Sequence, residues 1–213
     1  MMESEHRQEL KIVIRNATDF IKISKFIVQN NFNIHHPSRL INSFYFDNNF
    51  KDHEYSIEGI TPRKKIRIRA YGNSKNFKLD VCNLEKKVTF SDGKFKIIKK
   101  WNTLKKNNNL MNIEMLNHKN QILKKTLIPT IGVTYFRDYY VNADRVRCTI
   151  DRDIKYSFFR LNKDNIEIKN TINIERRKVF EIKNKKNTEL LLEKIDLHWQ
   201  RFSKYSNGIS RLS

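Results

Sequence analysis

The fold is decided by the stretch Lys65-Ile66-Arg67-Ile68-Arg69-Ala70-Tyr71, in which cations alternate with apolar residues. Successive side chains of a β-strand point to opposite faces, so this strand is expected to carry its cations on one face and its aliphatic residues on the other. The same alternation recurs at residues 7–12, 145–151 and 180–183. One interpretation is a sheet with one face on a core and the other in water.

Two features favour an enclosed charged face over a solvated one. A face that serves only solubility mixes Lys, Glu, Ser and Thr, whereas here Arg recurs at positions of the same parity. The clusters also include or adjoin the carboxylates Glu9, Glu85, Asp151 and Glu181, a mixture expected of a pocket that holds phosphates and a metal together. We therefore expect an α+β fold: an antiparallel β tunnel, closed as a barrel, with a charged interior and flanking helices.

Composition agrees with one globular domain that attracts polyanions. The chain has 213 residues, and 43 Lys and Arg against 23 Asp and Glu give a net charge of +20. With 38% hydrophobic residues it can bury a core, so we expect a single domain over residues 1–213. The positive electrostatic field of so large a net charge predicts a polyanionic partner: nucleic acid, an anionic membrane surface or a phosphorylated molecule.

Periodicity and cysteine spacing set further expectations. Apolar residues at helical spacing predict helices at residues 18–29, 101–125 and 188–202. Cys82 and Cys148 share no metal-ligand spacing, so we expect free thiols rather than a zinc site or a disulfide. No segment approaches the ~20 apolar residues of a membrane span, and residues 1–10 lack the apolar region of a signal peptide. The expected location is the cytoplasm.

A series of short motifs then matches one known family in order and spacing. They are Arg7-x-Glu9-Leu10-Lys11, Ser43-Phe44-Tyr45-Phe46-Asp47, Glu58-Gly59, Arg63-x-Lys65-x-Arg67-Ile68-Arg69-x-Tyr71, Leu84-Glu85-Lys86-Lys87, Tyr135-x-Arg137, Val146-Arg147-x-Thr149-x-Asp151, Phe180-Glu181-Ile182-Lys183 and Phe202-Ser203-Lys204-Tyr205. Together they resemble the VTC domain, the polyphosphate polymerase domain of the vacuolar transporter chaperone, within the CYTH or triphosphate tunnel superfamily.

The resemblance implies a metal-dependent enzyme that transfers the γ-phosphate of ATP to a growing polyphosphate chain inside a basic tunnel. It implies a phosphate-binding set of Lys11, Arg67, Arg69, Lys87, Arg137, Arg147, Lys183 and Lys204. It assigns Mn²⁺ or Mg²⁺ to Glu181. The catalytic set would be Lys11, Arg67, Arg69, Arg137, Arg147 and Glu181. ATP and polyphosphate are the implied partners, and the sequence does not indicate an oligomeric state.

One alignment within the resemblance is open to two interpretations. The family's Leu-Glu-x-Lys strand could correspond to Leu79-Asp80-Val81-Cys82 or to Leu84-Glu85-Lys86-Lys87. We choose the second segment, because Asp92-Gly93 then supplies the hairpin turn that should follow the strand. In the first alignment, Cys82 would occupy the position at which the family has a phosphate-binding lysine.

Two other functions compete with polymerisation. A hydrolase of the same superfamily would cleave inorganic triphosphate or a nucleoside triphosphate with water. Such enzymes open with Glu-x-Glu-x-Lys, and Arg7 stands here in place of the first Glu, which favours the polymerase. The third hypothesis is a non-catalytic polyphosphate- or polyanion-binding module. Nucleic acid is not expected, because the chain shows no helix-turn-helix, zinc-finger or RNP-like motif.

Overall fold

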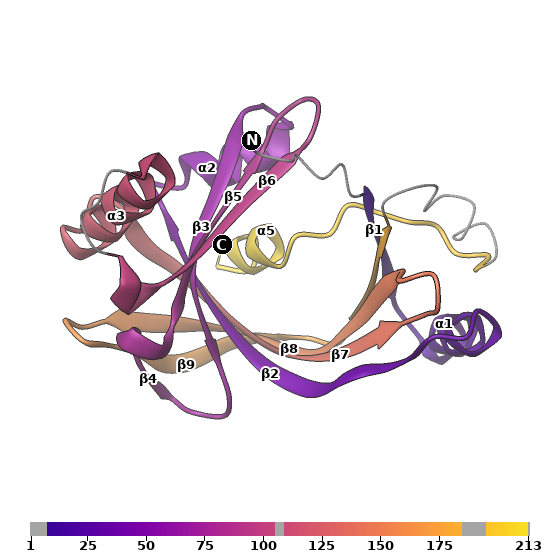
Figure 1. Ribbon diagram of the computed structural model, residues 1–213. Helices are drawn as coiled ribbons and strands as arrows, with labels where there is room; N and C mark the ends of the chain where they lie inside the picture. Colours follow the sequence, from indigo (N-terminus) through magenta and orange to yellow (C-terminus); the bar gives the residue numbers. More distant parts are fainter. Residues whose placement is uncertain (1–7, 105–108, 185–194, 213) are drawn as a thin grey trace. The chain divides into compact units, whose positions relative to one another are not determined.

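The computed structural model describes residues 8–104, 109–184 and 195–212, and about half of them lie in β-strands (Figure 1). The strands are β1 (Gln8–Ile14), β2 (Asn33–Asp47), β3 (Arg63–Tyr71), β4 (Asn76–Lys78), β5 (Asn83–Thr89), β6 (Lys94–Lys100), β7 (Ile128–Val141), β8 (Arg147–Leu161), β9 (Asn165–Glu175) and β10 (Lys178–Asn184). The helices are α1 (Ala17–Gln29), α2 (Lys51–Glu58), η1 (Leu79–Val81), η2 (Trp101–Thr103), α3 (Leu110–Leu123) and α5 (Lys204–Ile209).

The three predicted helices agree with the structure to different extents. The first is confirmed as α1, and its N-cap is Asn16, whose side-chain oxygen accepts a hydrogen bond from the backbone amide of Asp19. The second is confirmed in part as η2 and α3. Of the third, residues 188–194 lie outside the described part, and residues 195–203 contain no helix. Over residues 195–202 the apolar spacing was misleading, and the next helix along the described chain, α5, begins at Lys204.

The sheet is antiparallel in every pairing that the structure details, but it is not a ring. Its strand order is β1-β10-β8-β7-β2-β3-β5-β6, with β4 paired to β9 and β9 to β8. In the described part of the chain, β1 pairs only with β10 and β6 only with β5, so the main run of eight strands ends at β1 and at β6. The expected closed barrel is therefore corrected to an open antiparallel sheet. Alternation alone fixes the faces of strands and cannot show whether the last strand meets the first.

The chain forms two compact units, each with its own core. Unit 1 comprises residues 1–40, 135–155 and 174–203, and unit 2 comprises residues 41–134, 156–173 and 204–213. The unit 1 core lies between α1 and the apolar faces of β1, β8 and β10, where Ile12, Phe26, Ile150 and Phe180 are buried. The expectation of one domain over residues 1–213 stays a prediction.

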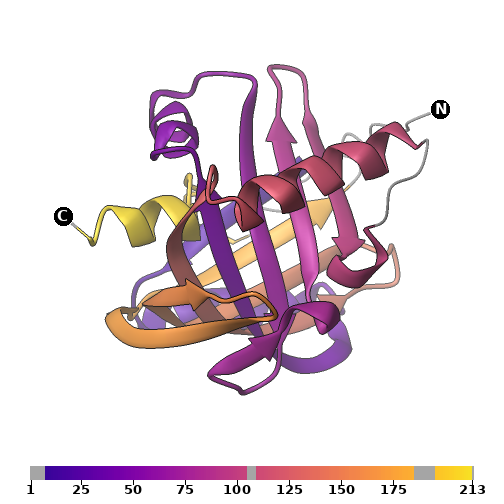
Figure 2. The ribbon, with the colours of Figure 1, turned by 90° about the vertical axis from the view of Figure 1, so that its left-hand side faces the viewer.

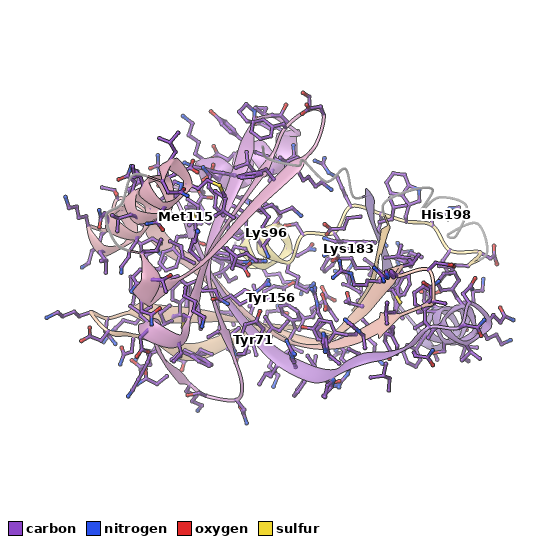
Figure 3. The ribbon with its side chains drawn as sticks, in the orientation of Figure 1. Tyr71, Lys96, Met115, Tyr156, Lys183 and His198 are labelled. Carbon is purple, nitrogen blue, oxygen red and sulfur yellow. The ribbon has the colours of Figure 1, made fainter. Side chains whose placement is uncertain are left out.

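In unit 2, helix α3 covers one face of the strands β3, β5 and β6 (Figure 2). Its residue Met115, labelled in Figure 3, packs with Ile66, Ile68 and Leu84 in the core. The aliphatic half of the alternating β3 segment is thereby buried. The cationic half of the same strand lies on the opposite face of the sheet.

The β5–β6 hairpin agrees with the chosen alignment. Leu79–Val81 is the short 3₁₀ helix η1, whereas Leu84 to Lys87 lie in β5. The amide of Phe90 donates to the carbonyl of Gly93 at 2.8 Å, which closes the turn at Asp92-Gly93 before β6. The predicted hairpin is confirmed, and the thiol of Cys82 is a free, buried group.

Among the described residues, none of the helices combines the length and the apolar character needed to cross a membrane.

Candidate functional site

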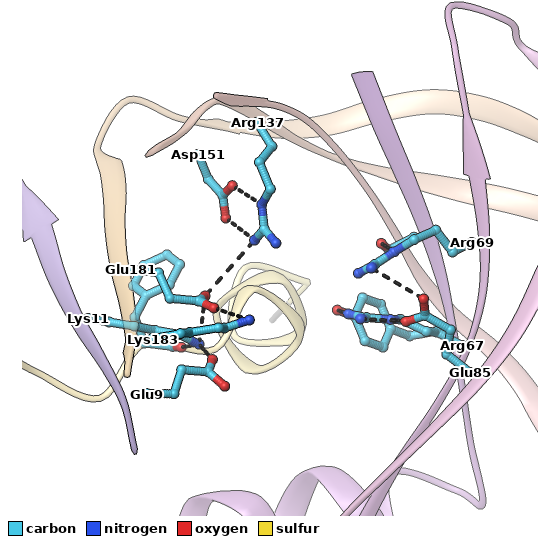
Figure 4. A network of polar contacts seen from close by, with 12 residues as sticks. Glu9, Lys11, Arg67, Arg69, Glu85, Arg137, Asp151, Glu181 and Lys183 are labelled. Atoms are coloured by element: carbon cyan, nitrogen blue, oxygen red, sulfur yellow. Dashed lines mark hydrogen bonds and ion pairs between the residues drawn. The ribbon is translucent and has the colours of Figure 1, made fainter. Parts of the chain in front are cut away.

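Two clusters of cations and carboxylates occupy the polar faces of the strands, one in each unit (Figure 4). In unit 1, β1 and β10 pair so that Lys11 lies opposite Glu181 and Glu9 opposite Lys183. The Lys183 ammonium lies 2.7 Å from Glu181 Oε1, and Lys11 Nζ lies 3.8 Å from Glu181 Oε2 and 3.2 Å from Glu9 Oε1. The neighbouring apolar residues Ile12 and Phe180 are buried in the unit 1 core, which turns these polar side chains to the other face.

Arg137 of β7 and Asp151 of β8 complete this unit 1 cluster. Arg137 donates from Nε to Asp151 Oδ1 at 2.6 Å and from Nη2 to Oδ2 at 2.7 Å. The same Nη2 lies 3.9 Å from Glu181 Oε2. Asp151 is fully buried, so the pair is a bidentate, charge-assisted contact protected from water.

The charges of the unit 1 cluster hold each other ionised. Burial by itself raises the pKa of Glu181, but the charges of Lys183, Lys11 and Arg137 outweigh it and keep that pKa well below its ordinary value. Burial lowers the pKa of Lys11, and the charges of Glu181 and Glu9 more than reverse this, so that pKa is raised. The three cations Lys11, Lys183 and Arg137 are matched by the three carboxylates, and the cluster is formally neutral.

The unit 2 cluster is built around Glu85 of β5. Arg67 of β3, directly opposite in the register, donates from Nε at 2.7 Å and places Nη2 2.6 Å from the same oxygen, Glu85 Oε2. Arg69 Nη1 lies 3.3 Å from Glu85 Oε1, and Lys96 Nζ of β6 lies 3.2 Å from Oε2. One buried carboxylate therefore serves three cations, which leaves this cluster with an excess of positive charge.

The excess charge shifts two pKa values in unit 2. Burial by itself raises the pKa of Glu85, but the charges of Arg67, Arg69 and Lys96 and the hydrogen bond from Arg67 bring it down to about 2. The pKa of Lys96 falls to about 8, because burial of its ammonium end and the charges of Arg67 and Arg69 outweigh the attraction of Glu85. The pKa falls although 37% of the Lys96 side-chain surface is exposed.

Sequence reasoning missed Lys96 and two polar partners of the arginines. Tyr45 Oη accepts a hydrogen bond from Arg67 Nη1 at 3.0 Å, and Ser43 Oγ accepts one from Arg69 Nε at 3.4 Å. The signal for Lys96 was present, because a hairpin turn at Asp92-Gly93 sets Lys96 opposite Lys87.

The remaining predicted site residues are placed as follows. Lys87 shares the polar face of β5 with Glu85, opposite Lys65 and Lys96. Arg147 is exposed and lies opposite Lys183 in the β8–β10 register. Lys204 is the first residue of α5 and is half-buried. The structure thus brings together Lys11, Arg137, Glu181 and Lys183 in unit 1, and Arg67 and Arg69 in unit 2. Convergence of both groups on one enclosed channel stays a prediction.

The donor set decides which kind of metal ion would fit. The described residues contain no group of three or more His, Cys, Asp or Glu side chains that could hold an ion together. A Mg²⁺-like cation, however, usually takes one or two carboxylates and completes its shell with substrate phosphates and water. Glu181, buried and ionised, fits such a cation when it arrives with a phosphate chain.

Comparison with known proteins identifies similar sequences and folds. The model of the VTC domain family matches residues 3–213. No curated protein matches the chain. The fold is similar to that of the PH1819 protein of Pyrococcus horikoshii OT3, with 14% identity, a TM-score of 0.54, and 97% of this chain and 99% of the other covered.

Two further solved structures share the fold. A Hippeastrum protein described with a dominant triphosphatase activity is 15% identical, with a TM-score of 0.52 and coverage of 95% of this chain and 94% of the other. A Vibrio parahaemolyticus protein, provisionally described as an adenylate cyclase, is 11% identical, with a TM-score of 0.50 and coverage of 98% and 99%. At these identities the likeness concerns the fold alone.

Proposed function

Because the chain belongs to the VTC domain family, we propose that it is a polyphosphate polymerase that takes phosphoryl groups from ATP. In each cycle the terminal phosphate oxygen of the growing chain attacks the γ-phosphorus of ATP. The bond from that phosphorus to the β–γ bridging oxygen breaks, and ADP leaves. No protein nucleophile is required, because the protein contributes alignment and charge neutralisation to such a transfer.

The observation that carries this proposal is the excess positive charge around Glu85. Arg67, Arg69 and Lys96 share one carboxylate, and Lys65 and Lys87 lie on the same faces of the neighbouring strands. A group of cations with a single counter-charge favours a polyanion, and Arg adds geometry that matches phosphate oxygens. We assign phosphate binding to Arg67, Arg69, Lys87 and Lys96 in this cluster, and to Lys204 of α5.

The unit 1 cluster has a different task in this proposal, because its formal charges cancel. Lys11, Lys183, Arg137 and the exposed Arg147 would bind phosphate oxygens as Glu181 shifts from its lysine partners to a divalent cation. Mn²⁺ or Mg²⁺ held at Glu181 would supply Lewis acidity to the phosphate oxygens. Glu9 would retain Lys11, to which it lies 3.2 Å away, when Glu181 is engaged elsewhere.

The deciding experiment incubates the purified protein with ATP and Mn²⁺, resolves the products on a urea gel and measures free phosphate. A ladder of polymers without a matching release of phosphate is the expected result. Arg67→Ala and Glu181→Ala should each abolish the ladder, through a loss of about 3 kcal/mol or more in barrier stabilisation. Full activity in either variant would remove that residue from the site.

A hydrolase is the second candidate, and the triphosphatase activity described for the Hippeastrum protein of the same fold favours it. Free phosphate without polymer would establish this reading. If the protein forms neither polymer nor free phosphate but binds tripolyphosphate measurably, it is a binding module. The replacement of the first acidic residue of the Glu-x-Glu-x-Lys pattern by Arg7 supports the polymerase, since it removes a carboxylate from the candidate metal ligands.

A further inference from the structure

The C-terminal helix α5 is tied to the rest of unit 2 through one buried carboxylate. The hydroxyl of Tyr205, the second residue of α5, donates to Asp47 Oδ2 at 2.5 Å. Asp47 ends β2 and is fully buried. Its two oxygens also accept hydrogen bonds from the backbone amides of Asp52 and His53, each at 3.0 Å. Asp47 therefore fixes the first turn of α2 and the start of α5 at the same time.

The ring of Tyr205 extends this anchor to the arginine cluster. It stacks on the ring of Tyr45, with 4.9 Å between centroids and 21° between planes. Tyr45, on the same face of β2 as Asp47, accepts the 3.0 Å hydrogen bond from Arg67. The Lys65 ammonium also lies 5.9 Å from the centre of the Tyr205 ring. A continuous path of contacts thus runs from Asp47 through Tyr205 and Tyr45 to Arg67, entirely within unit 2.

The chemistry of each link makes the path rigid. Tyr205 remains a protonated donor, because burial and the neighbouring Asp47 raise its pKa. Arg67 has all three nitrogens held, two of them by Glu85 and the third by Tyr45, so its plane has one favoured orientation. Two rings stacked at 4.9 Å restrict each other's rotation.

From this arrangement we propose that Tyr205 is a positioning residue for phosphate binding, which acts on Arg67 through Tyr45 and on Lys204 through the backbone. This inference rests on the proposed function of the unit 2 cluster. Lys204 directly precedes Tyr205, so the anchor on Asp47 sets where the Lys204 side chain begins. One hydroxyl and one ring therefore align a cation on β3 and a cation on α5.

Calorimetric titration of the protein with tripolyphosphate, without metal and well below the melting temperature, tests this proposal. Tyr205→Leu removes both ring and hydroxyl, and its affinity should fall about tenfold. Tyr205→Phe restores the stacking ring and should lose only about threefold. Tyr45→Phe keeps the stacked ring and removes only the hydroxyl that accepts the hydrogen bond from Arg67. Its affinity tests the same path independently if Tyr205→Leu does not fold. Tyr156→Phe, which truncates another fully buried tyrosine of unit 2, should stay within about twofold.

Coupling separates positioning from simple packing. If Tyr205 acts through Arg67 and Lys204, adding Tyr205→Leu to the Arg67→Ala variant should lower the affinity for tripolyphosphate by less than about threefold. Adding it to the Arg67→Ala, Lys204→Ala double variant should lower the affinity no further. Losses that multiply independently in these backgrounds would overturn the positioning role. So would wild-type affinity in both Tyr205→Leu and Tyr45→Phe. Absence of tripolyphosphate binding by the wild-type protein would instead overturn the proposed function, and this inference with it.

Discussion

Asp151 holds the guanidinium of Arg137 by two parallel hydrogen bonds of 2.6 and 2.7 Å, and it is itself completely buried. The next residue along each strand, Asp138 on β7 and Arg152 on β8, forms a second pair at 3.0 Å, with 18% and 32% of the side chains exposed. The two strands therefore carry the same ion pair twice, once buried and once near water. This repetition provides an internal control for the energetics of the site.

We expect Asp151→Asn to be far more damaging than Asp138→Asn. Removing one partner of a buried pair leaves a charge without its main counter-charge and costs about 3–5 kcal/mol. Surface pairs contribute about 0–1 kcal/mol, and the half-buried Asp138–Arg152 pair should lie nearer to that range. Urea denaturation followed by circular dichroism would measure both free energies of unfolding. Equal losses would mean that the Arg137–Asp151 pair is not protected from water in solution.

Phosphate binding should weaken as the pH rises through about 8, the pKa of Lys96. Above that pH the side chain is neutral in the free protein, so binding of an anion must take up a proton. Calorimetry at pH 8.5 in two buffers of different ionisation enthalpy would reveal this uptake. The Lys96→Arg variant keeps the positive charge at this pH and should take up fewer protons on binding the same ligand. The control Lys99→Arg, on the same strand, should match the proton uptake of the wild type. Identical uptake in all three proteins would exclude Lys96 as the titrating group.

Tripolyphosphate should raise the melting temperature of the wild-type protein. At a ligand concentration 100 times the Kd, linkage contributes about 2.7 kcal/mol, which corresponds to about 5–10 °C for a chain of this size. The shift should shrink in Arg67→Ala and in Arg69→Ala, because each removes a cation that shares Glu85. A thermal shift assay in low salt would measure it. No shift at millimolar ligand would count heavily against phosphate binding.

Gly208→Ala should loosen α5 despite the higher helix propensity of alanine. A Cβ at this position would lie 2.8 Å from both Ile131 Cδ1 and Tyr156 Cδ1. Tyr156 is fully buried and cannot move aside, so we expect a net loss of about 1–3 kcal/mol in the free energy of unfolding. Asn207→Ala, one position earlier in the helix, should be neutral or slightly stabilising. Equal stability of the two variants would show that α5 does not pack closely at Gly208.

The strands and their faces could be predicted from the sequence because alternation is a local property. Ile66 and Ile68 enter the core and Arg67 and Arg69 the opposite face, as the pattern of β3 predicts. The last part of the helix expected over residues 188–202 shows the limit of such reasoning: residues 195–202 have helical spacing and form no helix. Periodicity reports which residues prefer burial, and tertiary packing decides the conformation that buries them.

For the candidate site, the residue types were predictable and their partnerships were not. The sequence determined by itself that cations and carboxylates occupy one face of several strands, because a two-residue period is imposed by backbone geometry. Only the tertiary structure decided that Glu85 serves Arg67, Arg69 and Lys96, that Asp151 is committed to Arg137, and that Tyr205 reaches Asp47. Tyr205 and Asp47 are 158 positions apart in the chain. The atomic distances in all these contacts are set by strand register and helix docking, which residue type alone does not determine.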